Sequence, residues 1–298
     1  MEVVTPVPAL SICFVPTMAP ETLVHLARTV EAAGLDELWV WEDCFKQSGI
    51  ASAAVALAST GRIRVGIGLM PTPLRNVALT AMEVATLARQ FPGRLLPGIG
   101  HGVQEWMAQV GVRPRSPLTL LEEYATALRS LLAGERVTAD GTYVHLDGVQ
   151  LDWPPTTPPP LFVGGTGPRS IDLAARVGDG YLSPNAWTDA QIADVSERVT
   201  AVRGIGHPFV FSEIAATGPG ARERVDAEVP RWGAEAGPNI GTAGDLDVFV
   251  DAVRRIAGLG VTNLVFQPTQ DEPDLDGFIA FVGQVRARLL TEVTPWVS

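Results

Sequence analysis

The chain has 298 residues, of which 46% are hydrophobic and 18% charged, so it can bury a large core and is close in size to one complete α/β barrel. It carries 33 acidic and 22 basic residues, a formal net charge of -11, and no run rich in lysine and arginine. This balance argues against DNA or RNA as a partner, because surfaces that bind nucleic acids are basic.

Short apolar runs alternate with segments of helical periodicity, a pattern typical of parallel strands that helices cover on both faces. Eight runs are predicted as strands: residues 10–15, 37–41, 65–70, 95–99, 161–164, 180–183, 209–214 and 263–267. Between the first two, Pro20 and Gly34 mark the start and end of a helix. Eight such units favour an α/β fold of the (β/α)8 or TIM-barrel type, which we expect to form a single domain over residues 1–298.

The connection between the fourth and fifth strands is too long for an ordinary barrel loop. It contains a predicted helix over residues 118–132 and then the run 136–145, in which Asp140-Gly141 signals a β-hairpin. The sequence therefore predicts an excursion of a helix and a hairpin between strands four and five. A second irregular stretch, residues 217–240, is a candidate lid or cap.

Glycines gather where the third, fourth and fifth strands end, which is where α/β barrels place their functional groups. They are Gly66, Gly68, Gly98, Gly100, Gly102, Gly164, Gly165 and Gly167. Such glycines permit the close approach of a planar ligand or an unusual backbone geometry. After the fifth strand, the amides of a helix N-terminus, with Thr166 and Arg169, are suited to a phosphate group; an ordinary tight turn is the alternative. The spacing is not the GxGxxG of a dinucleotide-binding fold.

Six segments in a fixed order are more specific than any of these motifs alone. They cover residues 31–43, 62–76, 92–102, 131–141, 160–168 and 173–180, and include Pro92-Gly-Arg-Leu-Leu-Pro-Gly-Ile-Gly-His-Gly102 and Pro160-Leu-Phe-Val-Gly-Gly-Thr-Gly-Pro168. Through them the chain resembles the bacterial luciferase-like monooxygenase family over residues 10–185, and more loosely beyond. The resemblance implies a barrel that binds FMN or the deazaflavin coenzyme F420, with the ring over the third strand and the phosphate near the fifth.

The resemblance also implies a set of cofactor-binding residues at these strand ends. They are Gly68, Leu69, Met70, Gly100, Gly102, Gly164, Gly165, Thr166 and Gly167. Family members commonly carry a non-proline cis peptide at the third strand, and the matching bond joins Gly68 and Leu69; an ordinary trans bulge is the alternative. Residues 71–76 and 98–106 are similar to those of F420-dependent reductases in the family, which favours F420 over FMN.

Candidate proton-handling residues are Glu42 and Asp43 after the second strand and His101 after the fourth. Family members often have a histidine where this chain has Cys44, and a thiol with a pKa of about 8.5 does not replace an imidazole. Glu42 is the better candidate for proton transfer at this strand end if burial raises its pKa; the alternative is that it only accepts hydrogen bonds. The substrate pocket is expected to include Thr17, Trp41, Cys44 and Trp187.

The resemblance thus implies an F420-dependent oxidoreductase that transfers hydride between the deazaflavin C5 and a small organic substrate. An FMN-dependent monooxygenase, which uses O2 and reduced FMN from a separate flavin reductase, is the first alternative. The second is a non-catalytic flavin-binding barrel. We also expect a homodimer, as related barrels often pair through their second and third helices.

The remaining expectations concern location and metals. The first six residues lack the basic segment of a secretory leader and no apolar run is long enough to cross a membrane, so we expect a cytoplasmic protein without a membrane partner. The four histidines show no HxxxH or HExxH spacing, and Cys13 and Cys44 show no CxxC spacing. We therefore expect no metal site and no disulfide framework.

Overall fold

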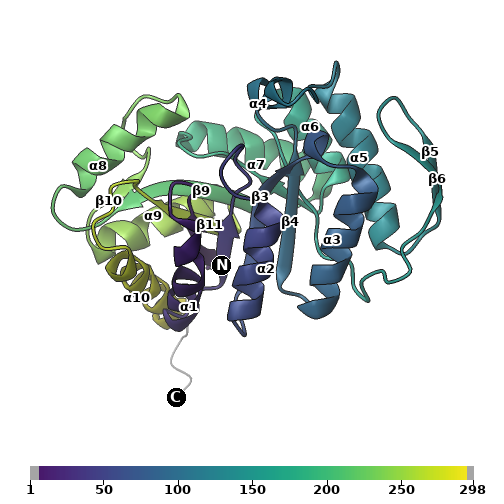
Figure 1. Ribbon diagram of the computed structural model, residues 1–298. Helices are drawn as coiled ribbons and strands as arrows, with labels where there is room; N and C mark the ends of the chain where they lie inside the picture. Colours follow the sequence, from purple (N-terminus) through teal and green to yellow (C-terminus); the bar gives the residue numbers. More distant parts are fainter. Residues whose placement is uncertain (1–6, 294–298) are drawn as a thin grey trace. The chain divides into compact units, whose positions relative to one another are not determined.

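The computed structural model describes residues 7–293, in which strands and helices alternate from the first element to the last (Figure 1). Eight of the strands in this range overlap the eight predicted ones and end within two residues of them. They are β1 (Ala9–Phe14), β2 (Glu37–Val40), β3 (Arg64–Pro71), β4 (Leu95–Gly100), β7 (Phe162–Gly164), β8 (Gly180–Leu182), β9 (Phe209–Ala216) and β11 (Asn263–Pro268). This is the strand and helix order of a (β/α)8 barrel.

The helices begin where the sequence offers caps. The α5 helix, for example, starts at Pro117 behind Ser116, whose hydroxyl accepts the Thr119 amide. The α-helices in residues 7–293 are α1 (Leu23–Ala32), α2 (Gly49–Ser59), α3 (Val77–Gln90), α4 (Gln104–Gln109), α5 (Pro117–Leu132), α6 (Pro168–Val177), α7 (Asp189–Arg203), α8 (Ala221–Glu228), α9 (Leu246–Gly258) and α10 (Leu275–Val293). Short 3-10 helices are η1 (Pro20–Thr22), η2 (Thr72–Leu74) and η3 (Val229–Trp232).

The chain divides into two compact units. The first consists of the residues up to Trp39 together with those from Ser183 onward, and the second is Val40–Leu182. The single domain expected over residues 1–298 stays a prediction.

In the first unit, β1, β9, β11 and the two-residue strand β10 (Thr242–Ala243) form parallel pairs, with β11 between β1 and β9. Helix α9 covers one face of β11, because the Phe249 ring lies 5.3 Å from that of Phe266. Side chains alternate along a strand, so Gln267 faces away from this helix.

The segment 217–240, predicted as a lid or cap, contains α8 and η3. Its apolar side chains pack on the end of β9 in a small core of their own, formed by Ala186, Ile214, Ala216, Ala221, Val225, Val229 and Ile240. Residues 217–240 therefore form a helical layer that packs on the end of β9. The neighbouring strand β10 was not predicted, because it is only two residues long.

In the second unit, β3, β4, β7 and β8 are parallel and pair in that order. The excursion after β4 contains α4, α5 and an antiparallel hairpin, β5 (Val137–Asp140) and β6 (His145–Val149), beside α5 in Figure 1. Asp140 pairs with His145, so the turn spans 141–144 and is longer than a two-residue Asp-Gly turn. Glu123 on α5 stabilises it by accepting the amides of residues 142, 143 and 144.

Three findings concern location, metals and thiols. No helix within residues 7–293 combines the length and the apolar character that a membrane span requires. The same residues contain no cluster of His, Cys, Asp and Glu suited to a metal ion. No disulfide joins Cys13 and Cys44. The first six residues, in which we expected no leader, lie outside the described residues.

Candidate functional site

Gly68 and Leu69 lie at a bulge of β3, where the register with β4 shifts between Ile67 and Met70. The peptide bond between Gly68 and Leu69 is cis, as the family resemblance predicted. A second non-proline cis bond, which the sequence did not suggest, joins Cys44 to Phe45. Gly68 and Leu69 are half-buried and Met70 is buried.

The glycines at the ends of β4 and β7 make room for the side chain of Leu69. A Cβ added to Gly100 would lie 2.6 Å from Leu69 Cδ2, and one added to Gly164 would lie at the same distance of 2.6 Å. The space that we expected these glycines to leave for a planar ligand is therefore occupied by leucine carbons. Leu69 as a whole residue is half-buried, so part of it stays exposed beside these glycines.

The turn from β7 into α6 has the features of an anion site. Gly167 is the N-cap of α6 and has no side chain to cap it, and a Cβ at this position would meet no atom within 4 Å. Pro168, the first residue of α6, has no N–H, and the amides of Ser170 and Ile171 donate to the Gly167 carbonyl at 2.8 and 2.9 Å. The Arg169 amide and the positive end of the helix dipole remain for a ligand. Thr166 and Arg169 are exposed at this turn. These residues fit a phosphate group.

Gly165, in contrast, is required by packing. A Cβ there would lie 2.6 Å from the Cβ of Ser170, and the Gly165 carbonyl accepts a short hydrogen bond from the buried Tyr181 hydroxyl. The sequence analysis did not assign a role to Ser170. Its position in the first turn of α6, just after the Gly-Thr-Gly-Pro run, was the available signal.

His101 connects this turn to α5. Its Nδ1 lies 3.2 Å from the Pro117 carbonyl oxygen, which can only accept, so Nδ1 carries the proton and Nε2 accepts from the Ser170 hydroxyl at 3.1 Å. Burial lowers the pKa of His101, and the bond to Pro117 offsets part of this effect. The imidazole is thus a neutral group that uses both nitrogens to position α5 and α6. Gly102, nearby, has a φ of 66° and packs on Pro71.

Glu42 is buried beside Arg75, a residue to which the sequence analysis gave no role. The Arg75 guanidinium donates a short hydrogen bond to Glu42 Oε1, and the Gly49 amide donates to Oε2 at 2.8 Å. Arg75 Nε lies 3.4 Å from a second carboxylate, Glu83. Burial lowers the pKa of Arg75, but the hydrogen bond and the charges of Glu42 and Glu83 outweigh it and raise that pKa. Both oxygens of Glu42 are therefore occupied by protein groups.

Asp43 and Cys44 follow directly and are half-buried. Burial raises the pKa of Asp43, against the attraction of Lys46. Burial and then the charges of Glu42 and Asp43 raise the pKa of the Cys44 thiol, so this side chain stays protonated near neutral pH. Asp43 is thus the carboxyl here best suited to carry a proton.

The predicted residues fall in both units. All of the proposed catalytic and cofactor-binding residues, with Trp41 and Cys44, lie in the second unit. Thr17, exposed after β1, and Trp187, half-buried after β8, lie in the first. Within the second unit, the structure brings together the ends of β3, β4 and β7 through Leu69, and the end of β4 and the start of α6 through His101.

The family model described as luciferase-like monooxygenase matches residues 5–219. The chain belongs to this family. The resemblance inferred from the six segments is thereby confirmed, and with it the assignment to a family of oxidoreductase enzymes.

Curated relatives resemble part of the chain. A 5,10-methylenetetrahydromethanopterin reductase of Methanolobus tindarius is 31% identical over 169 residues, 57% of this chain and 52% of the relative. An F420-dependent glucose-6-phosphate dehydrogenase of Kineococcus radiotolerans is 32% identical over 176 residues, 55% of this chain and 52% of that protein. The chain thus spans about half the length of the curated relatives that it matches.

Solved structures of the family share the fold over nearly the whole chain. A monooxygenase from Streptomyces bottropensis superposes with a TM-score of 0.82 at 18% identity and covers 94% of this chain and 99% of its own. At such an identity the likeness concerns the fold alone. It confirms the TIM-barrel class with a hairpin excursion that the sequence predicted.

Proposed function

We propose that the chain is an F420-dependent oxidoreductase acting on a small organic substrate. The main support is the N-terminus of α6 at Gly167, an anion site on the same sheet as the apolar surface of Leu69. Together they suit a ligand with a planar ring and a phosphate. The deazaflavin, when bound, supplies a carbon that gives or accepts a hydride. The F420-dependent relative supports this cofactor.

In this proposal, different residues of the chain bind the cofactor, carry a proton and position their neighbours. The Arg169 amide at the start of α6 and the side chains of Thr166 and Arg169 bind the phosphate, and Leu69 supports one face of the ring. Asp43, whose pKa is raised by burial, holds or releases a proton at its carboxyl group. Glu42 and His101, whose polar atoms are occupied by protein partners, position their neighbours.

The second candidate is an FMN-dependent monooxygenase that receives reduced FMN from a separate reductase. The support is the family description and the shared fold of the Streptomyces monooxygenase. The anion site and Leu69 suit FMN as well, since both cofactors join a tricyclic ring to a phosphate. The third candidate is a barrel that binds flavin without catalysis, because this chain has Cys44 where family members often have histidine.

Fluorescence titration of the purified chain with F420 and with FMN tests the choice of cofactor. We expect F420 to bind at least tenfold more tightly, a difference of about 1.4 kcal/mol. Tight binding of FMN alone would remove the preference for F420. Oxidation of reduced F420 by a substrate without oxygen supports the first function. Turnover that requires oxygen and reduced FMN supports the second, and tight binding without turnover over a substrate panel supports the third.

We also propose a homodimer that forms through α2 and α3. Four large apolar side chains are exposed on or next to these helices: Phe45, Val55, Leu79 and Met82, with exposed fractions of 64%, 45%, 47% and 58%. Exposed apolar groups on neighbouring elements are typical of a subunit interface. The cytoplasmic location stays a prediction.

A further inference from the structure

Among the residues that the structure describes, three buried side-chain oxygen atoms of the first unit have no hydrogen-bond partner. They are Asn185 Oδ1, Thr269 Oγ1 and Glu228 Oε1, in residues that are 4%, 1% and 3% exposed. Buried polar groups nearly always have a partner, since leaving one unpaired costs free energy. Asn185 follows β8, Thr269 follows β11, and Glu228 ends α8. In a barrel, these strand ends are where ligands bind.

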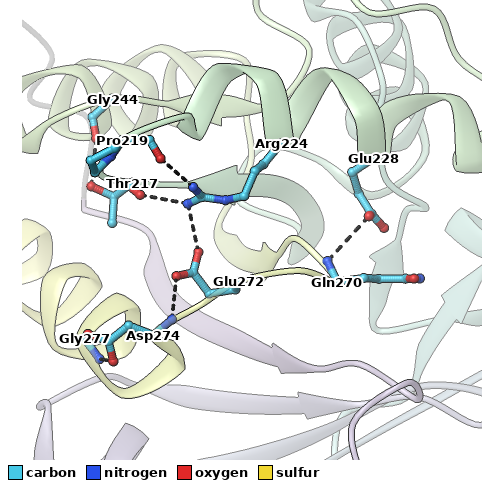
Figure 2. A network of polar contacts seen from close by, with 9 residues as sticks. All are labelled: Thr217, Pro219, Arg224, Glu228, Gly244, Gln270, Glu272, Asp274 and Gly277. Carbon is cyan, nitrogen blue, oxygen red and sulfur yellow. Dashed lines mark hydrogen bonds and ion pairs between the residues drawn. The ribbon is translucent and has the colours of Figure 1, made fainter.

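Several contacts hold the three groups along one stretch of chain. Asn185 Nδ2 donates a short hydrogen bond to Gln267 Oε1. Thr269 is the first residue after β11, two positions beyond Gln267, and is 1% exposed. Glu228 Oε2 accepts the amide of Gln270 at 3.5 Å, as Figure 2 shows. The unpaired atoms therefore belong to residues on or beside positions 267–270.

The loop after β11 is fixed in place by an ion pair. Arg224 on α8 donates to Glu272 Oε2 at 3.2 Å and to the carbonyls of Thr217 and Pro219, both at 2.8 Å (Figure 2). The other oxygen of Glu272 accepts the Asp274 amide at 3.1 Å. The two charged side chains are only 14% and 6% exposed. This network ties the loop after β11 to α8, the helix that ends at Glu228.

We propose that Glu228, Thr269 and Asn185 bind a hydroxyl or amine group of the substrate. A carboxylate and an amide oxygen only accept hydrogen bonds, and a threonine hydroxyl can also accept, so the matching group must donate. The proposal rests on the proposed function only in calling this ligand a substrate.

The charges nearby disfavour an anionic ligand. The loop contains Asp271, Glu272 and Asp274, and Asp276 lies in the first turn of α10. The Arg224 Nη atoms are bonded to Glu272 and to backbone carbonyls, although the buried Nε has no hydrogen-bond partner within residues 7–293, and Arg231 is paired with Glu228 Oε2 at 3.0 Å. A phosphate or carboxylate would add a further negative charge to this acidic surrounding, whereas a neutral alcohol or a protonated amine would not.

Probes with one carbon skeleton and three head groups test the charge preference. We would titrate the full chain with cyclohexanol, cyclohexylamine and cyclohexanecarboxylate and follow binding by NMR. We expect the alcohol and the amine to bind at least tenfold more tightly than the carboxylate. Tighter binding of the carboxylate, or no binding of the alcohol and the amine, would overturn the proposal.

Two isosteric variants locate the binding. Thr269→Val is expected to weaken the alcohol and the amine at least fivefold, because it removes the hydroxyl. Glu228→Gln is expected to weaken the amine more than the alcohol, because it removes the charge. Unchanged affinities in both variants would overturn the proposal.

Stability separates binding from a structural role. Thr80→Val is the matched control, because the Thr80 hydroxyl accepts the Tyr124 hydroxyl at 2.6 Å and its loss leaves a buried donor unpaired. We expect Thr80→Val to lower Tm and Thr269→Val to leave it unchanged or higher. An equal loss of Tm in both variants would assign Thr269 to the fold and overturn its role in binding. Titration of the same proteins with F420 and FMN tests the proposed function separately: if neither cofactor binds but the probe pattern holds, only the cofactor assignment fails.

Discussion

The side chain of Leu69 lies over Gly100, where an added Cβ would stand 2.6 Å from the leucine Cδ2. It covers Gly164 at the same distance of 2.6 Å. One leucine at the β3 bulge therefore contacts the ends of β4 and β7, and it can do so only because two neighbouring positions lack side chains. Its exposed part is the surface that we assign to the cofactor ring.

Gly100→Ala is expected to displace Leu69, to lower the free energy of unfolding by about 1 to 3 kcal/mol and to weaken F420 binding. Leu69→Ala in the same chain should recover most of that stability, because it removes the colliding carbons. Urea denaturation of the four members of this cycle measures the coupling. Gly61→Ala, whose Cβ meets no atom within 4 Å, is the control. If Gly100→Ala lowers the free energy of unfolding by the same amount with and without Leu69→Ala at the bulge, the contact between Leu69 and Gly100 is contradicted.

Gly167→Asp should separate stability from phosphate binding. The new side chain enters open space at the N-cap of α6, a position that aspartate favours, so the stability should be unchanged or slightly higher. Its negative charge should weaken F420 and FMN at least tenfold by repelling the phosphate. Gly61→Asp adds the same charge away from α6. Unchanged cofactor affinity in Gly167→Asp would remove the phosphate assignment. Gly165→Asp is unsuitable, since it would collide with Ser170.

Arg75→Met is expected to destabilise the chain by about 3 to 5 kcal/mol, because it leaves the buried Glu42 without its cation and Glu83 without a neighbouring positive charge. Glu42→Gln should lower the free energy of unfolding by less, because Arg75 still has Glu83 as a negatively charged neighbour. The double variant should be more stable than Arg75→Met alone. Chemical denaturation at neutral pH measures all three. A double variant no more stable than Arg75→Met would show that the two side chains act independently.

Glu213 should make stability depend on pH. Burial raises its pKa from 4.5 to about 7, against the Thr242 hydrogen bond and the charge of Arg255. Folding therefore favours the protonated form, whose stabilisation is fully present below about pH 4.5 and is lost as pH rises through 7. The loss amounts to at most about 3 kcal/mol. Glu213→Gln should be more stable than the parent chain at pH 8 and similar to it at pH 5. A difference in unfolding free energy that is constant between these pH values would contradict this assignment.

Met82→Glu tests the subunit interface. A charge among the exposed apolar side chains of α2 and α3 should shift the chain from dimer to monomer, measured by light scattering after gel filtration. Val248→Glu, on α9, changes a side chain that is 45% exposed outside this surface and should leave the dimer intact. A parent chain that is already monomeric would exclude the proposed dimer.

Much of the fold could be predicted from the sequence, because strands, helices and turns depend on local patterns. Burial of each strand on both faces leaves a continuous apolar run, and proline and glycine mark the ends of helices. Eight strands, the hairpin excursion and the glycine-rich ends of β3, β4 and β7 followed from this. The position of the Gly68–Leu69 cis bond followed from the family resemblance.

The tertiary structure decided which side chains meet. Glu42 and Arg75 are 33 positions apart, His101 and Ser170 are 69 apart, and Asn185 and Gln267 are 82 apart. Neither helical nor strand periodicity carries information over such distances, since these pairs depend on the register of neighbouring strands and on how each helix packs. For the same reason the strand-end glycines were visible in the sequence, but only the packed structure showed that two of them are filled by Leu69.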